Sequence, residues 1–286
     1  MSPEALTALT LLIAESNPKD KSKMIGLVCR LLINKRPDPI RMKTRLNKFL
    51  ADRGVCSRRE ADRMIADGLV QINGVVAKLG TLVDEAVDDV AVRGKLLTTG
   101  RPKPIIIAFH KPIGLITSAD ERLHDNVITY LGFKERIFPV GRLDVASSGL
   151  LLLTNDGRLS EAITHPRYDH EKEYEVTVDR PIKAADLHRL ESGLIVLGSR
   201  TKTAPVERVN DRTFRIILTE GRNRQIRRMC EEIGYEVIKL KRIRVMNIKL
   251  GALPIGEWRE LTDRESSLLR DLLREPGKGG LAIAKK

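Results

Sequence analysis

The sequence predicts an α+β protein in which a small helix–helix–hairpin module precedes a larger domain with a mixed, mainly antiparallel sheet. Three observations support this class. Two short amphipathic segments are followed by an Asn-Gly turn before residue 76. After residue 105, many strand-like segments occur with few helices between them, which is typical of α+β rather than doubly wound folds. A basic stretch rich in glycine and proline separates the two regions.

Composition limits the classes of partner. The 286 residues are enough for two domains with hydrophobic cores, and the formal net charge of +13 favours a polyanion, either nucleic acid or an anionic membrane surface. No stretch has the apolar length of a membrane span, and the apolar N-terminal segment lacks the basic flank of a signal peptide. Three widely spaced cysteines indicate a reducing cytoplasm and argue against a zinc site or a disulfide framework.

The first predicted domain spans residues 43–98 and follows an extension, residues 1–42, to which we assign no function. Leu46, Phe49 and Leu50 lie three and four positions apart, on one face of a helix. The sequence from Ser57 to Glu60 has the spacing of a capping box and opens a second helix. Asn73-Gly74 between apolar residues predicts a two-residue hairpin turn.

This module is strongly basic. Residues 41–64 contain eight basic and three acidic residues. A charge run is usually a solvated face, but a one-signed excess on two rigid helices suits RNA phosphates. The candidate RNA-binding residues are Arg45, Lys48, Arg58, Arg59 and Arg63.

A linker, residues 99–104, leads to a second domain over residues 105–275, and residues 276–286 are predicted to be a disordered tail. Apolar patterning predicts strands over 105–109, 137–140, 150–154, 170–178, 203–209, 213–219 and within 235–250. It predicts helices over 127–131, 159–163, 184–190, after residue 221, and over 262–273, where Thr262 and Glu265 form another capping box.

The chain is organised around the loop that joins strands 137–140 and 150–154. This loop carries Arg142 and Asp144, so it fixes a carboxylate at the lip of a sheet, where the backbone is rigid and the side chain can reach a ligand. Taken alone, an Arg-x-Asp sequence in a loop is better explained by a solvated aspartate than by a functional site.

Other chemistries lack their motifs. The sequence has no G-x-x-x-x-G-K-[ST], no strand-linked G-x-G-x-x-G, no H-E-x-x-H and no cysteine cluster, so nucleotide and metal sites are not predicted. His110, His165 and His170 could act as bases, but no G-x-S-x-G elbow accompanies them. A second basic cluster, residues 221–244, suggests that one RNA spans both domains, although it also fits a solvated helix start. Its candidate RNA-binding residues are Arg222, Arg224 and Arg228.

Two sets of motifs resemble known families. In the first domain, residues 45–50, 54–61 and 70–74 resemble the RNA-binding module named after ribosomal protein S-four. In the second, residues 110–114, 141–144, 172–174, 221–229 and 256–261 resemble the pseudouridine synthases of the ribosomal RNA branch. The similarity covers roughly residues 43–275 and looks closest to synthases that act on large-subunit ribosomal RNA.

The resemblance implies a cofactor-free and metal-free isomerase that detaches uracil from its ribose and rejoins it through carbon. Asp144 matches the catalytic aspartate, which either attacks the anomeric carbon or deprotonates the sugar. Arg227 matches its basic partner, which would favour the ionised carboxylate, with a phosphate contact as the alternative role.

Further roles follow from the same resemblance. Tyr174 matches the aromatic residue that stacks on the uracil; a phenol is a poor base at neutral pH, so stacking is the safer assignment. The target base must be flipped out of its stack, and Arg142 is the candidate to fill the vacated space. Lys111 is expected to contact backbone phosphate.

Ribosomal RNA is the predicted partner, transfer RNA or small-subunit RNA are the alternative targets, and a cytoplasmic monomer is expected. A second hypothesis is an RNA-binding assembly factor that has lost catalysis, although a pure binder needs none of Asp144, Tyr174 and Arg227. A third is a glycosidase using Asp144 and Glu173, which lacks aromatic sugar platforms and does not explain the charge.

Overall fold

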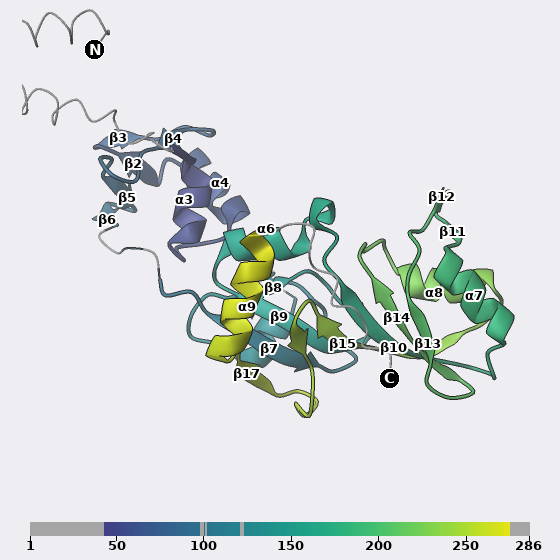
Figure 1. Ribbon diagram of the computed structural model, residues 1–286. Helices are drawn as coiled ribbons and strands as arrows, with labels where there is room; N and C mark the ends of the chain where they lie inside the picture. The colour runs from purple at the N-terminus through teal and green to yellow at the C-terminus, as the bar shows by residue number, and fades with distance from the viewer. Residues whose placement is uncertain (1–42, 98–99, 101, 121–122, 275–286) are drawn as a thin grey trace, which may run out of the picture. The chain divides into compact units, whose positions relative to one another are not determined.

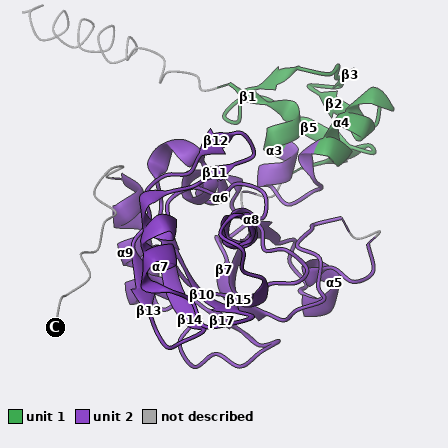
Figure 2. Cartoon of the chain, turned by 90° about the vertical axis from the view of Figure 1, so that its right-hand side faces the viewer, with its two compact units in different colours: residues 1–49, 59–97 green, residues 50–58, 98–286 purple. Residues whose placement is uncertain are grey.

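The computed structural model describes residues 43–97, 100, 102–120 and 123–274 (Figure 1). The predicted extension, residues 1–42, and the predicted tail, residues 276–286, lie outside the described residues. The chain divides into two compact units, one of residues 1–49 and 59–97 and one of residues 50–58 and 98–286 (Figure 2). The predicted domain limits, 43–98 and 105–275, remain our proposal. No helix of the described part is long and apolar enough to cross a membrane.

The N-terminal part of the described chain consists of two short helices and short antiparallel strands. Its elements are β1 (Thr44–Arg45), α3 (Leu46–Asp52), α4 (Arg58–Ala66), β2 (Val70–Ile72), β3 (Val75–Val76), β4 (Leu82–Val83), β5 (Val90–Val92) and β6 (Lys95–Leu96). Leu46 and Phe49 are buried on one face of α3, as their spacing predicts. Asn73 and Gly74 have φ of 51° and 80°, the left-handed pair of a type I′ turn between β2 and β3. The predicted helix–helix–hairpin order is confirmed.

The second unit contains the larger sheet and most of the helices. Its strands are β7 (Ile106–Lys111), β8 (Phe138–Val140), β9 (Ser148–Thr154), β10 (Lys172–Val178), β11 (Ile195–Val196), β12 (Ser199–Arg200), β13 (Val206–Arg208), β14 (Thr213–Leu218), β15 (Val237–Val245), β16 (Ile248–Lys249) and β17 (Trp258–Glu260). Its helices are α5 (Val127–Leu131), α6 (Gly157–Thr164), the short 3-10 helix η1 (Pro166–Tyr168), α7 (Ala184–Ser192), α8 (Gln225–Glu232) and α9 (Asp263–Arg274).

The sheet is mixed and mainly antiparallel, as predicted. Its strand order is β13-β14-β10-β15-β9-β7-β17, with β16 paired to β15 and β8 paired to β9. Every pair is antiparallel except β9–β15, which is parallel over only two residue pairs. This junction joins the two halves of the sheet, and the loop that carries Asp144 leads directly into it.

β9 is buried on both faces, which explains its continuous apolar sequence. Leu150 and Leu152 belong to a core with residues of α6 and α9, whereas Leu151 and Leu153 belong to a core with α5. A third core lies between β10, β14, α7 and α8. Because β9 is fixed from both sides, the loop that precedes it begins from a rigid base.

Gly149 is the residue that allows β9 and β15 to meet. Its φ is +110°, and a Cβ atom at this position would lie 2.3 Å from the carbonyl oxygen of Arg242. No side chain fits at that distance, so the parallel junction requires glycine here.

A local signal accounts for the start of α9, whereas the shortest strands give no such signal. The capping box of α9 forms as predicted: Thr262 Oγ1 accepts from the Glu265 amide at 3.2 Å, and the Glu265 carboxylate accepts from the Thr262 amide at 3.0 Å. The β11–β12 hairpin, by contrast, was not predicted. Two-residue strands show no alternation, and its turn places Leu197 at a φ of 54°, where leucine gives no turn signal.

Candidate active site

The loop Gly141–Ser147, between β8 and β9, is held by hydrogen bonds to its backbone from several elements. Each carbonyl from Arg142 to Ser147 is an acceptor. The Arg142 carbonyl accepts from Arg242, the Leu143 carbonyl from Thr117, and the Asp144 carbonyl from Lys111 and the Ser147 amide. The Val145 carbonyl accepts from the Gly114 amide, the Ala146 carbonyl from Arg227, and the Ser147 carbonyl from Lys111. A backbone fixed at six consecutive carbonyls holds the Arg142 and Asp144 side chains on a rigid base.

Three of these donors are buried cations. Lys111 is fully buried, and its ammonium donates to the Ser147 carbonyl at 2.9 Å. Arg242 is 3% exposed and donates to the Arg142 carbonyl at 3.3 Å and the Leu150 carbonyl at 2.7 Å. Burial lowers the pKa of Lys111 to about 8, an effect that the Asp144 carboxylate opposes and Arg242 adds to. Lys111 therefore lies beneath the loop, whereas the sequence suggested a phosphate contact for it.

Arg227 is the third cation, and α8 positions it. It is 9% exposed and donates to the carbonyl of Ala146 at 2.8 Å and to that of Val237 at 2.9 Å. Burial lowers its pKa, as does Arg224, while Asp144 acts in the opposite direction. Among the described residues, Arg227 and Asp144 form no ion pair within 4.0 Å, so Arg227 acts on the carboxylate through its field and through the loop backbone.

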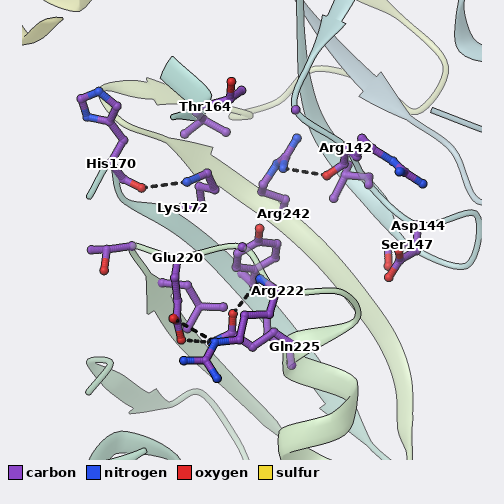
Figure 3. A pocket seen from close by; sticks show the side chains of 18 of the residues that line it. Arg142, Asp144, Ser147, Thr164, His170, Lys172, Glu220, Arg222, Gln225 and Arg242 are labelled. Carbon is purple, nitrogen blue, oxygen red and sulfur yellow. Dashed lines mark hydrogen bonds and ion pairs between the residues drawn. The ribbon is translucent and has the colours of Figure 1, made fainter. Parts of the chain in front are cut away.

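A pocket of about 460 Å³ opens beside this loop (Figure 3). Asp144 and Arg142 line it from the loop, and Tyr174 lines it from β10. Tyr174 also packs against the apolar cores on both sides of the sheet junction. The structure thus brings together the predicted carboxylate, the predicted aromatic residue and the arginine beside them in a volume suited to a small ligand.

The predicted basic residues of the α8 region have different surroundings. Arg224 is exposed and lines the pocket, with a φ of 52° just before α8. Arg222 also lines the pocket, but its guanidinium donates to Glu220 at 3.1 Å and to the Ser199 carbonyl at 2.9 Å. Arg228 is half-buried, does not line the pocket, and contacts Asn223 Oδ1 at 3.3 Å.

The five predicted RNA-binding residues of the first domain lie before and along its helices. Arg45 is exposed in β1 and Lys48 is half-buried on α3. Arg58, Arg59 and Arg63 are exposed on α4, where Arg63 contacts Glu60 at 3.2 Å. Three guanidinium groups on one nine-residue helix make a compact basic surface.

Two residues of the pocket were missed by sequence reasoning about roles. Lys172 and Arg242 both line it, and each gave a signal that was left without a role. Lys172 belongs to the Lys-Glu-Tyr motif that precedes Tyr174, and Arg242 to the basic run of β15. The cause is three-dimensional: nothing in the local sequence says which charged neighbours share a face.

The histidines considered as bases make structural contacts instead. His110 Nδ1 lies 2.7 Å from the Leu253 carbonyl, and His170 Nε2 lies 3.0 Å from the Ala162 carbonyl. His165 accepts from the Arg167 amide at the start of η1. Across the described residues, no three His, Cys, Asp or Glu side chains are grouped so that they could hold a metal ion.

Comparisons with known proteins show which family the chain resembles. A family model described as RNA pseudouridylate synthase matches residues 105–232, and the S4 domain model matches residues 44–90. The chain is 47% identical over 223 residues, 78% of its length and 77% of the relative's, to the dual-specificity RNA pseudouridine synthase RluF of Salmonella typhi. It is 39% identical to the ribosomal large subunit pseudouridine synthase B of Bacillus subtilis, over 80% of this chain and 96% of that one.

A solved structure shows the same fold. A crystal structure of a pseudouridylate synthase superposes with a TM-score of 0.57 at 31% identity and covers 80% of this chain and 99% of that one. The sequence identity to RluF covers more than three quarters of both chains, and the S4 and synthase models match in that order along the sequence. The chain therefore belongs to the RNA pseudouridine synthases, isomerases that act on RNA, with an S4 domain in front of the catalytic fold.

Proposed function

We propose that this enzyme converts a uridine of large-subunit ribosomal RNA to pseudouridine and that Asp144 acts at the ribose of the target. The observation that carries this is the geometry of the loop Gly141–Ser147, which holds Asp144 rigidly in the same pocket as Tyr174. The target RNA is proposed from the printed names of the relatives, one of which is a ribosomal large subunit synthase.

Each residue has a distinct part in the proposal. Asp144 either attacks C1′ or removes a proton from the sugar, and both routes need the carboxylate that the loop presents. Tyr174 stacks on the uracil in the pocket. Arg142 is exposed at the rim, where it can fill the space that a flipped base leaves. Arg227 fixes the loop through the Ala146 carbonyl, and its burial speaks against a phosphate contact.

The glycosidase hypothesis loses its second carboxylate. Glu173 is next to Tyr174 in sequence but does not line the pocket, and its carboxylate binds Arg244 at 2.8 Å. A pair of carboxylates that flank a sugar would have to share one site. Glu220 does line the pocket, but its carboxylate accepts hydrogen bonds from Arg222 at 3.1 Å and from Gln225 at 2.6 Å, so Asp144 is the carboxylate that we assign to the sugar.

The test is Asp144→Asn assayed on large-subunit ribosomal RNA transcribed in vitro. The amide keeps the shape of the side chain but removes its negative charge, so we expect pseudouridine formation to fall below detection with RNA affinity within about twofold of wild type. Asp211→Asn, an exposed residue outside the pocket, is the matched control and should behave as wild type. Pseudouridine formed by the Asp144 variant at the wild-type rate would overturn the assignment, and an inactive but RNA-binding wild type would favour the assembly-factor hypothesis.

The target and the state of the protein can be measured directly. Mapping pseudouridines in a deletion strain would identify the uridine and would separate large-subunit RNA from small-subunit or transfer RNA. We also propose that the enzyme is a monomer in the cytoplasm, where the RNA of its bacterial relatives is made. Light scattering of the purified chain should give the mass of one copy, 32.1 kDa.

A further inference from the structure

Two cations of the pocket have no carboxylate partner among the described residues. The ammonium of Lys172 donates to the His170 carbonyl at 2.9 Å and to no other described group. Arg242 donates to two carbonyls, and its buried Nη2 atom has no hydrogen-bond partner in the described part of the chain. Figure 3 shows Lys172 and Arg242 next to each other on the wall of the pocket. Arg242 is buried and Lys172 is half-buried, and cations withdrawn from water are normally paired, so these two form a site suited to an anion.

A β-bulge explains why no carboxylate reaches them. On β15, Arg242 is opposite Tyr174 and Arg244 is opposite Glu173, with a register shift between the two pairs. The extra residue turns two arginines that are two positions apart toward opposite faces of the sheet. Arg244 forms ion pairs with both neighbouring carboxylates, Glu171 at 3.0 Å and Glu173 at 2.8 Å.

Lys172 is therefore separated from its own neighbours in sequence. Glu171 and Glu173 flank it, but alternation along β10 directs both to the face that holds Arg244. Asp169, the acidic residue whose charge raises the pKa of Lys172, has an exposed carboxylate that forms an ion pair with Lys202. The positive charge at Lys172 is left uncompensated inside the pocket.

Alternation also places Lys172 next to the proposed base-binding residue. Lys172 and Tyr174 are two positions apart on β10, and both line the pocket. A uracil stacked on the Tyr174 ring has its carbonyl oxygens at the edge of the ring plane. Lys172 lies on the same side of the strand as that ring, within the reach of a lysine side chain.

The reaction class produces an anion at this place. When the C1′–N1 bond breaks, its electron pair leaves with uracil, and the negative charge is shared between N1 and the O2 and O4 oxygens. While uracil is detached, C1′ is bonded either to an Asp144 oxygen or, after Asp144 has taken the C2′ proton, by a double bond to C2′. When the ring has turned, electrons from C5 form the new bond to C1′ as that ester bond breaks or that proton returns to C2′. The C5 proton is lost, and N1 gains a proton. Reactant and product are isomers, so no oxidant or co-reactant is needed.

We propose that Lys172 is a further catalytic residue, whose ammonium hydrogen-bonds a uracil carbonyl oxygen and stabilises the negative charge that uracil carries while it is detached from the ribose. Arg242 is the positioning residue behind it, joining the Arg142 carbonyl of the loop to the Leu150 carbonyl of β9. This inference rests on the proposed function, because it uses Tyr174 as the base-binding residue. Fixed cations in a site shielded from water stabilise such a charge far better than water does.

Electrostatics at Lys172 agree with this role. The pKa of Lys172 is lowered to about 8, chiefly by burial and in addition by Arg242, while Asp169 opposes the shift. The ammonium is thus still charged at neutral pH but is poorly solvated, the state in which it gains most from an incoming anion.

The test is single-turnover kinetics with Lys172→Met and Lys172→Arg on large-subunit ribosomal RNA transcribed in vitro. We expect Lys172→Met to lower the rate at saturating RNA about 100-fold, and the RNA dissociation constant to stay within about twofold. Lys172→Arg keeps the charge and should recover most of the rate. Lys249→Met removes an exposed lysine on β16, outside the pocket, and should match wild type.

A leaving-group experiment separates charge stabilisation from simple binding. In transcripts that carry 5-fluorouridine, the detached uracil anion is more stable and needs less help from Lys172. The ratio of the wild-type rate to the Lys172→Met rate, measured as consumption of the target nucleoside, should therefore be about tenfold smaller than with uridine. An unchanged rate in Lys172→Met would overturn the inference. So would a raised dissociation constant with an unchanged rate, since Lys172 would then be binding a phosphate. If wild type itself forms no pseudouridine, the proposed function fails first. Unchanged RNA affinity, and a melting temperature of the variants no lower than that of wild type, exclude misfolding as the cause.

Discussion

Lys111, buried under the Asp144 loop, and Lys172, half-buried in the pocket, link pH to activity. Both have a pKa near 8 in the folded protein, against 10.5 for an exposed lysine. Arg242 and Asp169 act on the pKa of Lys172, and Asp144 and Arg242 act on that of Lys111. Lys172 in turn contributes to lowering the pKa of the buried His170. Above pH 8 both ammonium groups lose their charge.

We predict that the single-turnover rate falls as the pH rises through about 8. In Lys172→Arg the guanidinium stays charged, so the decline should become shallower, with only Lys111 left to titrate. Rates measured between pH 6 and 10 at saturating RNA test this, with RNA affinity followed as the control. Identical profiles for wild type and Lys172→Arg would contradict the assignment of this limb to Lys172.

Stability should move in the opposite direction. The folded pKa of each lysine lies below its unfolded value, so between pH 8 and 10.5 the unfolded chain binds more protons, and stability rises with pH. Compared with wild type, Lys172→Met should gain stability in urea near pH 7, because the poorly solvated charge at this position is removed, and this gain should shrink toward pH 10. Activity and stability are therefore set against each other by the same group.

Sequence alone could identify some residues of this site but not all of them. Asp144 and Tyr174 belong to short motifs, so a resemblance was enough to select them. Whether Lys172 has a carboxylate partner depends on strand register. The bulge in β15 places Arg244 opposite Glu173, and Arg244 forms ion pairs with both Glu171 and Glu173. In the linear sequence, Lys172 looks like a residue neutralised by two adjacent glutamates.

At the scale of elements, the junction of β9 and β15 decides whether the site exists. The strands touch at only two residue pairs, one of which joins Gly149 to Arg242. The same two strands carry the end of the Asp144 loop and the guanidinium that supports it. A small displacement here would move the loop relative to Tyr174.

We predict that Gly149→Ala destabilises the protein by on the order of 3 kcal/mol or more, because the new Cβ would meet the backbone of Arg242 at 2.3 Å and the φ is +110°. Gly198→Ala is the matched control. Its φ of +76° is also left-handed, but nothing lies within 4 Å of the added atom, so the expected cost is only about 1 kcal/mol. Urea unfolding of both variants measures the difference; equal costs would show that the close approach does not matter.

The elements that local signals encode were predicted, and those that depend on partners were not. The Asn73-Gly74 turn and the Thr262 capping box are decided by residues within a few positions of each other. The parallel pairing of β9 with β15 joins residues more than ninety positions apart. No periodicity within β9 tells which strand lies beside it, only that both of its faces are buried.

At the scale of the whole molecule, positive charge serves two separate purposes. Inside the second unit, buried Lys111, Arg227 and Arg242 hold one loop and leave few donors for RNA. On α4, Arg58, Arg59 and Arg63 are exposed, where phosphate can reach them. The net charge of +13 therefore overstates the positive charge available for RNA. This division can be tested by removing exposed positive charges outside the pocket and measuring RNA binding and catalysis separately.

We predict that replacing Arg58, Arg59 and Arg63 by Gln weakens RNA binding and lowers the slope of log affinity against log salt by about 2 to 3, one counterion release of about 0.7 to 0.9 for each lost contact. The control replaces Lys78, Arg93 and Lys95 by Gln, which removes the same charge from exposed positions outside both helices. Binding at several salt concentrations should separate the two triple variants, whereas equal slopes would mean that net charge alone matters.

At saturating RNA, the α4 variant should form pseudouridine at the wild-type single-turnover rate, since none of its changes touches the pocket that holds Asp144. A slowed rate at saturation would instead assign the S4 domain a part in placing the target base.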